Sequence, residues 1–122
     1  MKLCVTSTGK DLDAMVNEHF GKADYFLIVN TETMEVRAIP NTAHSPGRGT
    51  GAGAAQLVLD NGADTVLTGV IGLNAFNALK VGLVDIYEGA SPQETVREAV
   101  ERFKKGEYRE CSAPTGGPSY RS

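Results

Sequence analysis

The sequence predicts an α/β fold in which helices cover a mixed sheet, and three observations support that class. The chain has 122 residues, of which 41% are hydrophobic, enough to bury one core in a single domain. Short apolar segments rich in β-branched residues alternate with segments of helical periodicity. Their order is a strand, a hairpin of two strands, and then helix–strand–helix–strand–helix. Such alternation is typical of a sheet with helices packed against it.

Three strands are predicted in the first 40 residues. Residues 2–8 alternate larger apolar side chains with cysteine and threonine, and they include several β-branched residues. Residues 25–30 form a continuous apolar run, which is typical of a strand buried on both faces. Residues 34–39 alternate again and form the hairpin partner. Pro40 ends this ladder because its nitrogen has no hydrogen to donate.

The middle of the chain predicts two helices, each followed by a strand. The expected order is a helix over 51–61, a strand over 64–69, a helix over 73–81 and a strand over 83–87. Thr50 is a suitable N-cap for the first helix, and Gly62 suits the left-handed position that ends it. Gly82 stops the second helix.

The last predicted helix has the clearest signals. Ser91-Pro92-Gln93-Glu94 supplies an N-cap, a proline at the first helical position and a capping-box glutamate. Apolar residues then follow at helical spacing, namely Val96, Ala99, Val100 and Phe103. Gly106 ends the helix. Residues 107–122 have the composition of a flexible C-terminal tail, so we expect a single domain over residues 1–106.

The composition argues against several classes of function. Twelve Lys and Arg against 15 Asp and Glu give a net charge of −3, whereas a nucleic-acid surface needs clustered basic charge. No apolar run reaches the ~18–20 residues of a membrane span, and the start lacks a signal-peptide core. Two cysteines without a Cys-x-x-Cys motif indicate neither a disulfide framework nor a zinc site. We expect a soluble cytoplasmic protein that binds neither nucleic acid nor membranes.

Glycine is over-represented, with 14 residues, or roughly 11% against roughly 7% in average chains. Two Gly-rich turns, at residues 47–53 and 69–72, connect a strand to a helix. Ligands of α/β sheets bind beyond the carboxyl ends of the strands, where helix N-termini attract anions. The candidate anion-binding residues are therefore Arg48, Gly49, Gly51, Gly53, Gly69 and Gly72.

The first Gly-rich turn also has two other interpretations. From Gly49 to Ala54 it fits the dinucleotide-binding pattern Gly-x-Gly-x-x-Ala. That pattern should follow its strand directly, however, and about eight residues separate Ile39 from Gly47. The other interpretation is a flexible loop in which glycine only permits the turn.

Histidine and cysteine supply the candidate metal ligands. Both histidines, His19 and His44, fall in predicted loops, and neutral imidazole is a common ligand of iron, copper and zinc. A lone histidine in a loop is more often simply solvated. Cys4 is either a soft metal ligand or a small buried hydrophobe. Cys111 is expected to be an exposed thiol in the tail.

Several strings of residues together resemble a known family. The most specific is Glu18-His19-Phe20-Gly21-Lys22-Ala23. Weaker ones are residues 1–6, Ala54-Ala55-Gln56-Leu57, Gly62-Ala63-Asp64, Gly69-x-x-Gly72-x-x-Ala75 and Val84-x-Ile86-Tyr87. With the hairpin and the loop rich in His and Gly, they make residues 1–106 resemble the dinitrogenase iron–molybdenum cofactor biosynthesis family. Its members include NifX, NafY and the C-terminal region of NifB.

The resemblance implies a ribonuclease-H-like fold, with a five-stranded mixed sheet and helices on both faces. It also implies non-covalent binding of metal–sulfur clusters or cofactor precursors rather than catalysis. His19 matches the histidine of the family's His-Phe-Gly motif, and His44 falls in a loop where members often carry histidine. Cys4 stands where alanine is more usual.

The residues and the resemblance together predict a small cytoplasmic protein, not an enzyme, that binds or carries an anionic metal–sulfur cluster or an iron–molybdenum cofactor precursor. The expected cluster is Fe–S, Mo–Fe–S or Mo–Cu–S. Its expected metal ligands are His19, His44 and Cys4, and the glycines and Arg48 named above complete the cofactor site. The expected partners are donor or acceptor proteins of cluster assembly related to nitrogen fixation.

Two alternatives stay open. One is a metal-dependent hydrolase that uses the carboxylates of Asp11, Asp13 and Asp85. Asp11 and Asp13 are two residues apart on a predicted loop, where the other interpretation is that they cap their own backbone. The second alternative is a regulatory or interaction module that binds no ligand.

Overall fold

A computed structural model describes residues 1–43 and 51–114, which form a six-stranded sheet with three helices. The strands are β1 (Lys2–Ser7), β2 (Tyr25–Asn30), β3 (Val36–Pro40), β4 (Thr65–Leu67), β5 (Asp85–Glu88) and β6 (Arg109–Glu110). The helices are α1 (Gly51–Asp60), α2 (Leu73–Val81) and α3 (Val96–Lys104). None of these helices is long and apolar enough to cross a membrane.

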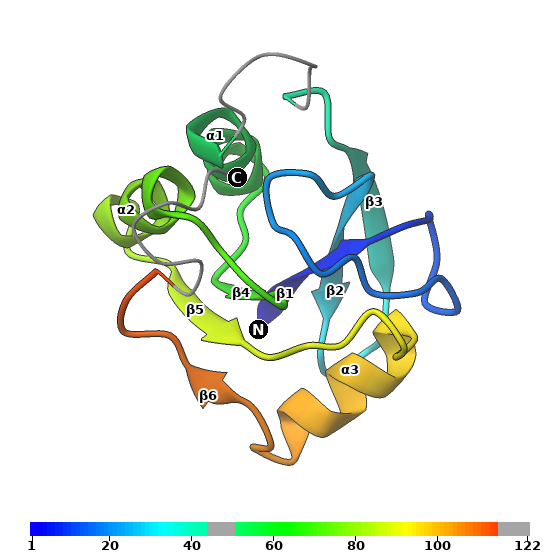
Figure 1. The fold of residues 1–122 in the computed structure, drawn as a ribbon. Helices are drawn as coiled ribbons and strands as arrows, with labels where there is room; N and C mark the ends of the chain where they lie inside the picture. The colour runs from blue at the N-terminus through cyan, green and yellow to red at the C-terminus, as the bar shows by residue number, and fades with distance from the viewer. Residues whose placement is uncertain (44–50, 115–122) are drawn as a thin grey trace.

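The sheet is mixed, as predicted, with the strand order β3-β2-β1-β4-β5-β6 (Figure 1). β1 and β4 run parallel, as do β4 and β5, and the other neighbouring pairs are antiparallel. The carboxyl ends of β1, β4 and β5, at Ser7, Leu67 and Glu88, therefore lie along one edge, called here the carboxyl edge. α1 leads into β4, and α2 lies between β4 and β5, each through a short connection. Both helices therefore begin at this edge and run back along the sheet.

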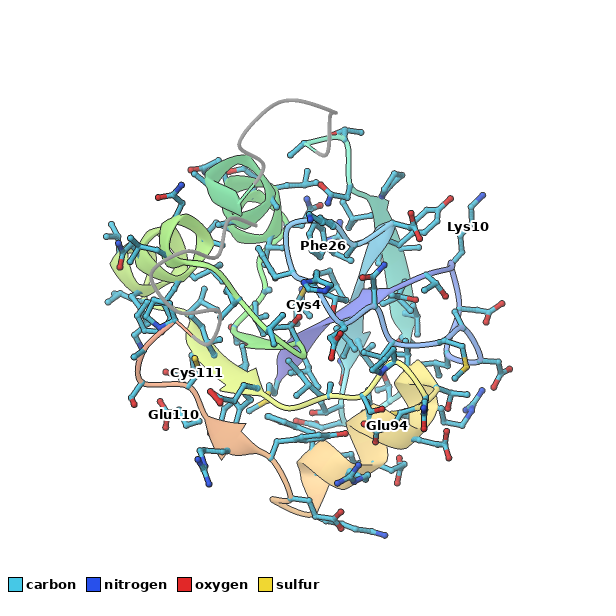
Figure 2. All side chains as sticks on the ribbon, in the orientation of Figure 1. Cys4, Lys10, Phe26, Glu94, Glu110 and Cys111 are labelled. Atoms are coloured by element: carbon cyan, nitrogen blue, oxygen red, sulfur yellow. The ribbon has the colours of Figure 1, made fainter. Side chains whose placement is uncertain are left out.

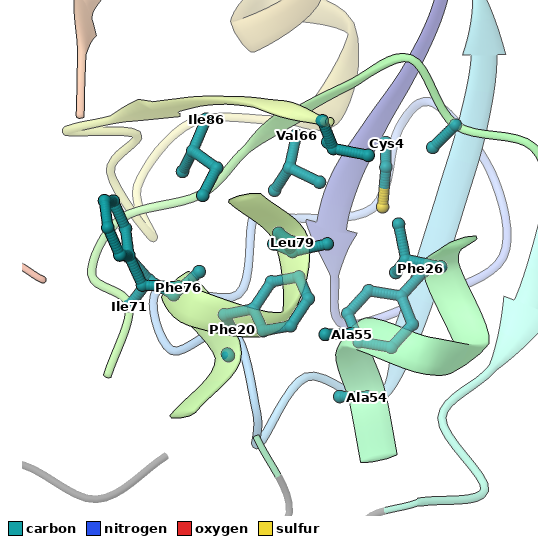
Figure 3. Packing of buried hydrophobic residues seen from close by; sticks show 14 of the residues in the cluster. Cys4, Phe20, Phe26, Ala54, Ala55, Val66, Ile71, Phe76, Leu79 and Ile86 are labelled. Atoms are coloured by element: carbon teal, nitrogen blue, oxygen red, sulfur yellow. The ribbon is translucent and has the colours of Figure 1, made fainter. Parts of the chain in front are cut away.

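Helices cover both faces of the sheet, as predicted (Figure 1). On β1, Cys4 faces a core formed with α1 and α2, whereas Leu3 and Val5 face a second core formed with α3. The strand period of two explains this division, because successive side chains point to opposite faces. Figure 3 shows the first core, in which the rings of Phe20 and Phe26 lie 5.1 Å apart between their centroids.

The sixth strand corrects the expectation of five. β6 pairs antiparallel with β5, and the N–H of Cys111 donates to the carbonyl of Ile86 at 2.7 Å. The sequence predicts a tail over residues 107–122, and Arg109 and Glu110, which are both charged, show no apolar alternation that would indicate a strand. Both side chains are exposed on a short edge strand, which needs no apolar face. Residues 109–111 therefore belong to the sheet and its edge rather than to a tail, and the ribonuclease-H-like class stays a prediction.

Several element boundaries differ from the predicted ones, and two of these differences have clear local reasons. β3 begins at Val36 rather than at residue 34, because Met34 adopts a left-handed φ of 63° in the turn after Asn30. α3 begins after Thr95, whose side chain accepts from the Glu98 N–H in a capping box. Ser91 and Glu94 form a separate turn just before it.

Glu94 joins that turn to α3 and to the C-terminal segment (Figure 2). Its carboxylate accepts from the Ser91 N–H at 2.8 Å, from Arg102 Nη1 at 2.6 Å and from Tyr108 Oη at 2.8 Å. Burial alone would raise the pKa of the Glu94 carboxyl, but these hydrogen bonds outweigh it and hold the pKa below its usual range. The network ties the segment that leads to β6 onto α3.

A lowered pKa predicts that Glu94 stabilises the fold above about pH 4.3, the usual glutamate value, and that this stability is lost as the pH falls through the lower folded-state value. Glu94→Gln should lower the free energy of unfolding by about 1–3 kcal/mol at pH 7, because it weakens charged hydrogen bonds. Urea unfolding at pH 7 and at pH 3 measures both effects. Glu101→Gln is the control, since Glu101 makes an exposed ion pair with Lys104 and should change stability by less than about 0.5 kcal/mol. Equal effects of the two substitutions at pH 7 would contradict the prediction.

Candidate functional site

His19 is held at the carboxyl edge by pairing with the loop between β4 and α2. The Val70 N–H donates to the Glu18 carbonyl at 2.8 Å, and the Phe20 N–H donates to the Val70 carbonyl at 3.2 Å. His19 and Val70 thus form an isolated parallel bridge. The pairing places the imidazole-bearing residue beside the residues that lead into α2.

The neighbours of His19 explain why the chain folds this way. Phe20 and Ala23 are fully buried, so both anchor the segment in the core under α1 and α2. A Cβ on Gly69 would lie 2.7 Å from the Glu18 carbonyl oxygen and 2.8 Å from that of Ala90. Gly69 is therefore needed for close approach of three backbone segments. We expected Gly69 to bind the anion directly, and the structure gives it this packing role.

Both helices that begin at the carboxyl edge suit an anion. α2 begins after its N-cap Gly72, which has no side chain to cap the helix, and α1 begins at the buried Gly51. The first turns of α1 and α2 are both described, and neither contains an acidic residue. The positive ends of two helix dipoles are thus turned toward the same edge without a carboxylate of their own first turns to neutralise them.

Asn41 is a residue of this region that we did not identify from the sequence. Its side-chain Nδ2 donates to the carbonyls of Gly21 at 3.2 Å and Ala23 at 2.9 Å, and its Oδ1 accepts from the Ala43 N–H. It therefore clamps the chain after β3 to the segment that follows His19. The signal was an asparagine directly after the strand-ending Pro40, where side-chain turns are common.

The first Gly-rich turn is described only in part. Gly53 lies against the chain after β3, since a Cβ on it would be 3.2 Å from the Ala43 Cβ. The candidate residues His44, Arg48 and Gly49 and the predicted N-cap Thr50 lie outside the described residues.

The imidazole of His19 is accessible. Its side chain is 41% exposed, and its Nε2 lies 3.7 Å from Glu18 Oε1. Glu18 is itself 48% exposed, so solvent weakens this pair. His19 is therefore an accessible group beside the loop that leads into α2.

Comparisons with known proteins identify the family of this chain. A family model described as dinitrogenase iron–molybdenum cofactor matches residues 1–106. The chain belongs to the dinitrogenase iron–molybdenum cofactor family. The resemblance carried by the Glu-His-Phe-Gly string and the weaker motifs is thereby confirmed.

Relatives of this family member match most of its length. The apo form of the orange protein of Desulfovibrio gigas is 33% identical, with a TM-score of 0.88 over 93% of this chain and 95% of that chain. A candidate NifB protein of Thermotoga is also 33% identical, with a TM-score of 0.79 over 93% of this chain and 96% of that chain. An uncharacterized protein of Methanocaldococcus jannaschii is 28% identical over 94 residues, which are 75% of this chain and 78% of that protein.

Cys4 and Cys111 are both buried in this member of the dinitrogenase iron–molybdenum cofactor family. Cys4 lies in mid-strand among apolar side chains of the first core (Figure 3), and burial holds the pKa of its thiol well above the usual range. This placement favours the small buried hydrophobe over the metal ligand. Cys111 is only 1% exposed, which corrects the expectation of an exposed thiol. Its Sγ donates to the Ala113 carbonyl at 2.8 Å, and burial, with Glu88 nearby, raises its thiol pKa to about 11.

Both thiols are therefore expected to react slowly with Ellman's reagent in the folded protein. A thiol with a pKa of about 11 carries roughly 100-fold less thiolate at pH 8 than one with an ordinary value of about 9. Cys111 should react before Cys4, because opening the short edge strand β6 needs less disruption than opening β1. The absorbance change at pH 8, with Cys111→Ser to assign the phases, checks this order. A native Cys111 that reacts as fast as the unfolded protein would contradict the burial.

The carboxylates of the predicted hydrolase do not converge. Asp11 Oδ1 accepts from the Asp13 N–H at 3.0 Å, so this pair caps its own backbone, and Asp13 also pairs with Arg97. Asp85 begins β5 and so lies at the end of the sheet opposite the carboxyl edge. Among residues 1–43 and 51–114, no group of three His, Cys, Asp or Glu side chains is placed to hold a metal ion.

Proposed function

We propose that this protein binds or carries an anionic metal–sulfur cluster, or an iron–molybdenum cofactor precursor, at the carboxyl edge. The observation that carries the proposal is the pairing of Glu18 and Phe20 with Val70, which holds an accessible His19 beside the loop that leads into α2, at the edge of the sheet where α1 also begins. Membership of the dinitrogenase iron–molybdenum cofactor family and the likeness to the orange protein and to a candidate NifB protein support a cofactor-carrier role.

The chemistry of the edge suits such a cargo. A cluster rich in sulfide is negatively charged and soft, so peptide N–H groups at helix N-termini stabilise its charge, and a neutral imidazole binds iron or copper. We propose His19 and His44 as the metal ligands, with Arg48 and the backbone of Gly49, Gly51, Gly53 and Gly72 around the sulfides. Few protein ligands suit a carrier, because the cargo must be released to an acceptor protein.

The proposed setting is the cytoplasm, where the protein receives and delivers cargo without catalysing a reaction. We also propose that its fold belongs to the ribonuclease-H-like class. The mixed sheet with helices on both faces supports that assignment.

Anaerobic purification tests the proposed function most directly. The protein should absorb in the visible region, and elemental analysis should find iron, or molybdenum with iron or copper, together with sulfide. Reconstitution of cargo-free protein with iron(II) and sulfide, or with tetrathiomolybdate and copper(I), should restore the absorption. A colourless protein that stays metal-free after both treatments would favour the interaction module instead.

A further inference from the structure

Two buried threonine hydroxyls lie directly beneath the His19 segment. Thr6 is near the end of β1 and Thr68 follows β4, and both side chains are 0% exposed. Their Oγ1 atoms are 3.0 Å apart. Because Thr6 is two residues from Cys4, and Thr68 two from Val66, the alternation of the strands places both threonines on the face covered by α1 and α2.

The hydroxyl protons can be assigned by counting donors. The Asn17 carbonyl oxygen can only accept, and it lies 2.6 Å from Thr6 Oγ1, so Thr6 donates to it. Thr68 is then left to donate to Thr6 across the 3.0 Å contact. The Glu18 carbonyl, which also accepts from the Val70 N–H, is a second acceptor within reach of Thr68 Oγ1, but at 3.5 Å it is the longer and weaker contact. The hydroxyls thus form a chain from Thr68 through Thr6 to the backbone two residues before His19.

Asn17 transmits this constraint to His19. Its N–H donates to the Thr6 carbonyl at 2.9 Å, so Thr6 holds both polar groups of the Asn17 backbone. Its side-chain Oδ1 accepts from the His19 N–H at 3.4 Å. On the other side of His19, Phe20 is fixed by its buried ring and by Val70. The backbone is therefore fixed on both sides of His19, by Asn17 and by Phe20. The contacts of Asn17 include side-chain hydroxyls, whereas those of Phe20 do not.

We propose that Thr6 and Thr68 are positioning residues, whose hydroxyl pair fixes Asn17 and so directs His19 toward the cargo. The proposal rests on the proposed function. Two hydroxyls buried on a face that is otherwise apolar need partners, since an unpaired buried hydroxyl is costly. Valine has nearly the same shape, so packing alone does not require threonine at either position. The hydrogen bonds to the His19 segment are what the hydroxyls add.

Isosteric substitutions test the proposal. Thr6→Val and Thr68→Val remove the hydroxyls, whereas Thr6→Ser keeps one. Thr65→Val is the matched control, because Thr65 is a buried threonine of β4 at the end opposite the carboxyl edge. With tetrathiomolybdate and copper(I) as the probe, Thr6→Val and Thr68→Val should each weaken retention about 10-fold, the lower end of the effect of removing a supporting hydrogen bond from a metal ligand. Thr6→Ser and Thr65→Val should stay within about twofold of the wild type.

A double substitution separates positioning from general destabilisation. In a His19→Ala background, Thr6→Val should weaken retention no further, because it acts through His19. Additive losses would overturn the proposal. Hydrogen exchange of the His19 amide in the cargo-free protein is a readout that needs no cluster. Thr6→Val should accelerate this exchange at least about 10-fold relative to Thr65→Val.

The two readouts distinguish failure of this proposal from failure of the proposed function. If His19→Ala retains the probe like the wild type, the ligand role of His19 is wrong, and the exchange rate alone decides whether the hydroxyls position the segment. If His19→Ala loses the probe but Thr6→Val changes neither retention nor exchange, only the positioning role is overturned.

Discussion

His19→Ala is expected to weaken retention of the cluster 10- to 100-fold, the range by which perturbing a metal site through its supporting groups lowers metal affinity. The free energy of unfolding should change by less than about 0.5 kcal/mol, as for other exposed positions. The structure supports this separation, because the backbone of Glu18 and Phe20 and the buried Phe20 ring anchor the segment. Titration of cargo-free protein with tetrathiomolybdate and copper(I), beside urea unfolding, measures both quantities.

Glu18→Gln is the matched control for His19→Ala. It removes the carboxylate that lies 3.7 Å from His19 Nε2 but leaves the imidazole in place. If the imidazole is a ligand, Glu18→Gln should not weaken retention of the cluster. Because it removes a negative charge near an anionic cargo, it should strengthen binding. His44→Ala should cause a loss of its own. Wild-type affinity in the double variant His19→Ala, His44→Ala would rule out histidine ligation at this site.

The types of most elements could be predicted because local signals agreed with the tertiary structure. The apolar run of β2 is buried on both faces, as its composition indicates. Gly62 and Gly106 both end helical segments with positive φ values of 79° and 75°. α3 shows the limit of such signals, since Ser91-x-x-Glu94 and Thr95-x-x-Glu98 fit the same capping pattern. The second became the helix start because the buried side of the helix begins at Val96.

The motifs of the candidate site could be identified from the sequence, but the contacts between them could not be predicted. The His-Phe-Gly motif and the turn at 69–72 were identified separately, and the pairing of His19 with Val70 was not predicted. Sequence separation explains the difference, because this contact joins segments that are about 50 residues apart. The buried Thr6–Thr68 pair and the Asn41 clamp depend in the same way on distant partners. Residues of this kind carry no local periodicity that would reveal them.

Gly69→Ala is expected to have the largest effect on the fold of any single substitution considered. Its Cβ would overlap the carbonyl oxygens of Glu18 and Ala90, at 2.7 and 2.8 Å. Neither segment can retreat freely, because the Glu18 carbonyl accepts from the Val70 N–H and the Ala90 N–H donates to the Thr68 carbonyl. Overpacking of this kind costs about 1–3 kcal/mol or more, and we expect a loss of about 3 kcal/mol in the free energy of unfolding. Displacement of Glu18 should also carry His19 away from the start of α2 and weaken cluster retention at least about 10-fold.

Gly53→Ala provides the comparison, because it adds the same methyl group at the other Gly-rich turn. There the contact that the new Cβ makes within the described part of the chain is with the Ala43 Cβ at 3.2 Å, which a small shift can relieve. Alanine is also favoured over glycine within a helix by about 1 kcal/mol, so stability should stay within about 1 kcal/mol of the wild type. Urea unfolding of both variants, followed by titration with the probe cluster, separates the two positions. A Gly69→Ala protein as stable as Gly53→Ala would show that the three backbone segments can part without cost. In that case, Gly69 would not be required for the close backbone packing that places His19 beside the start of α2.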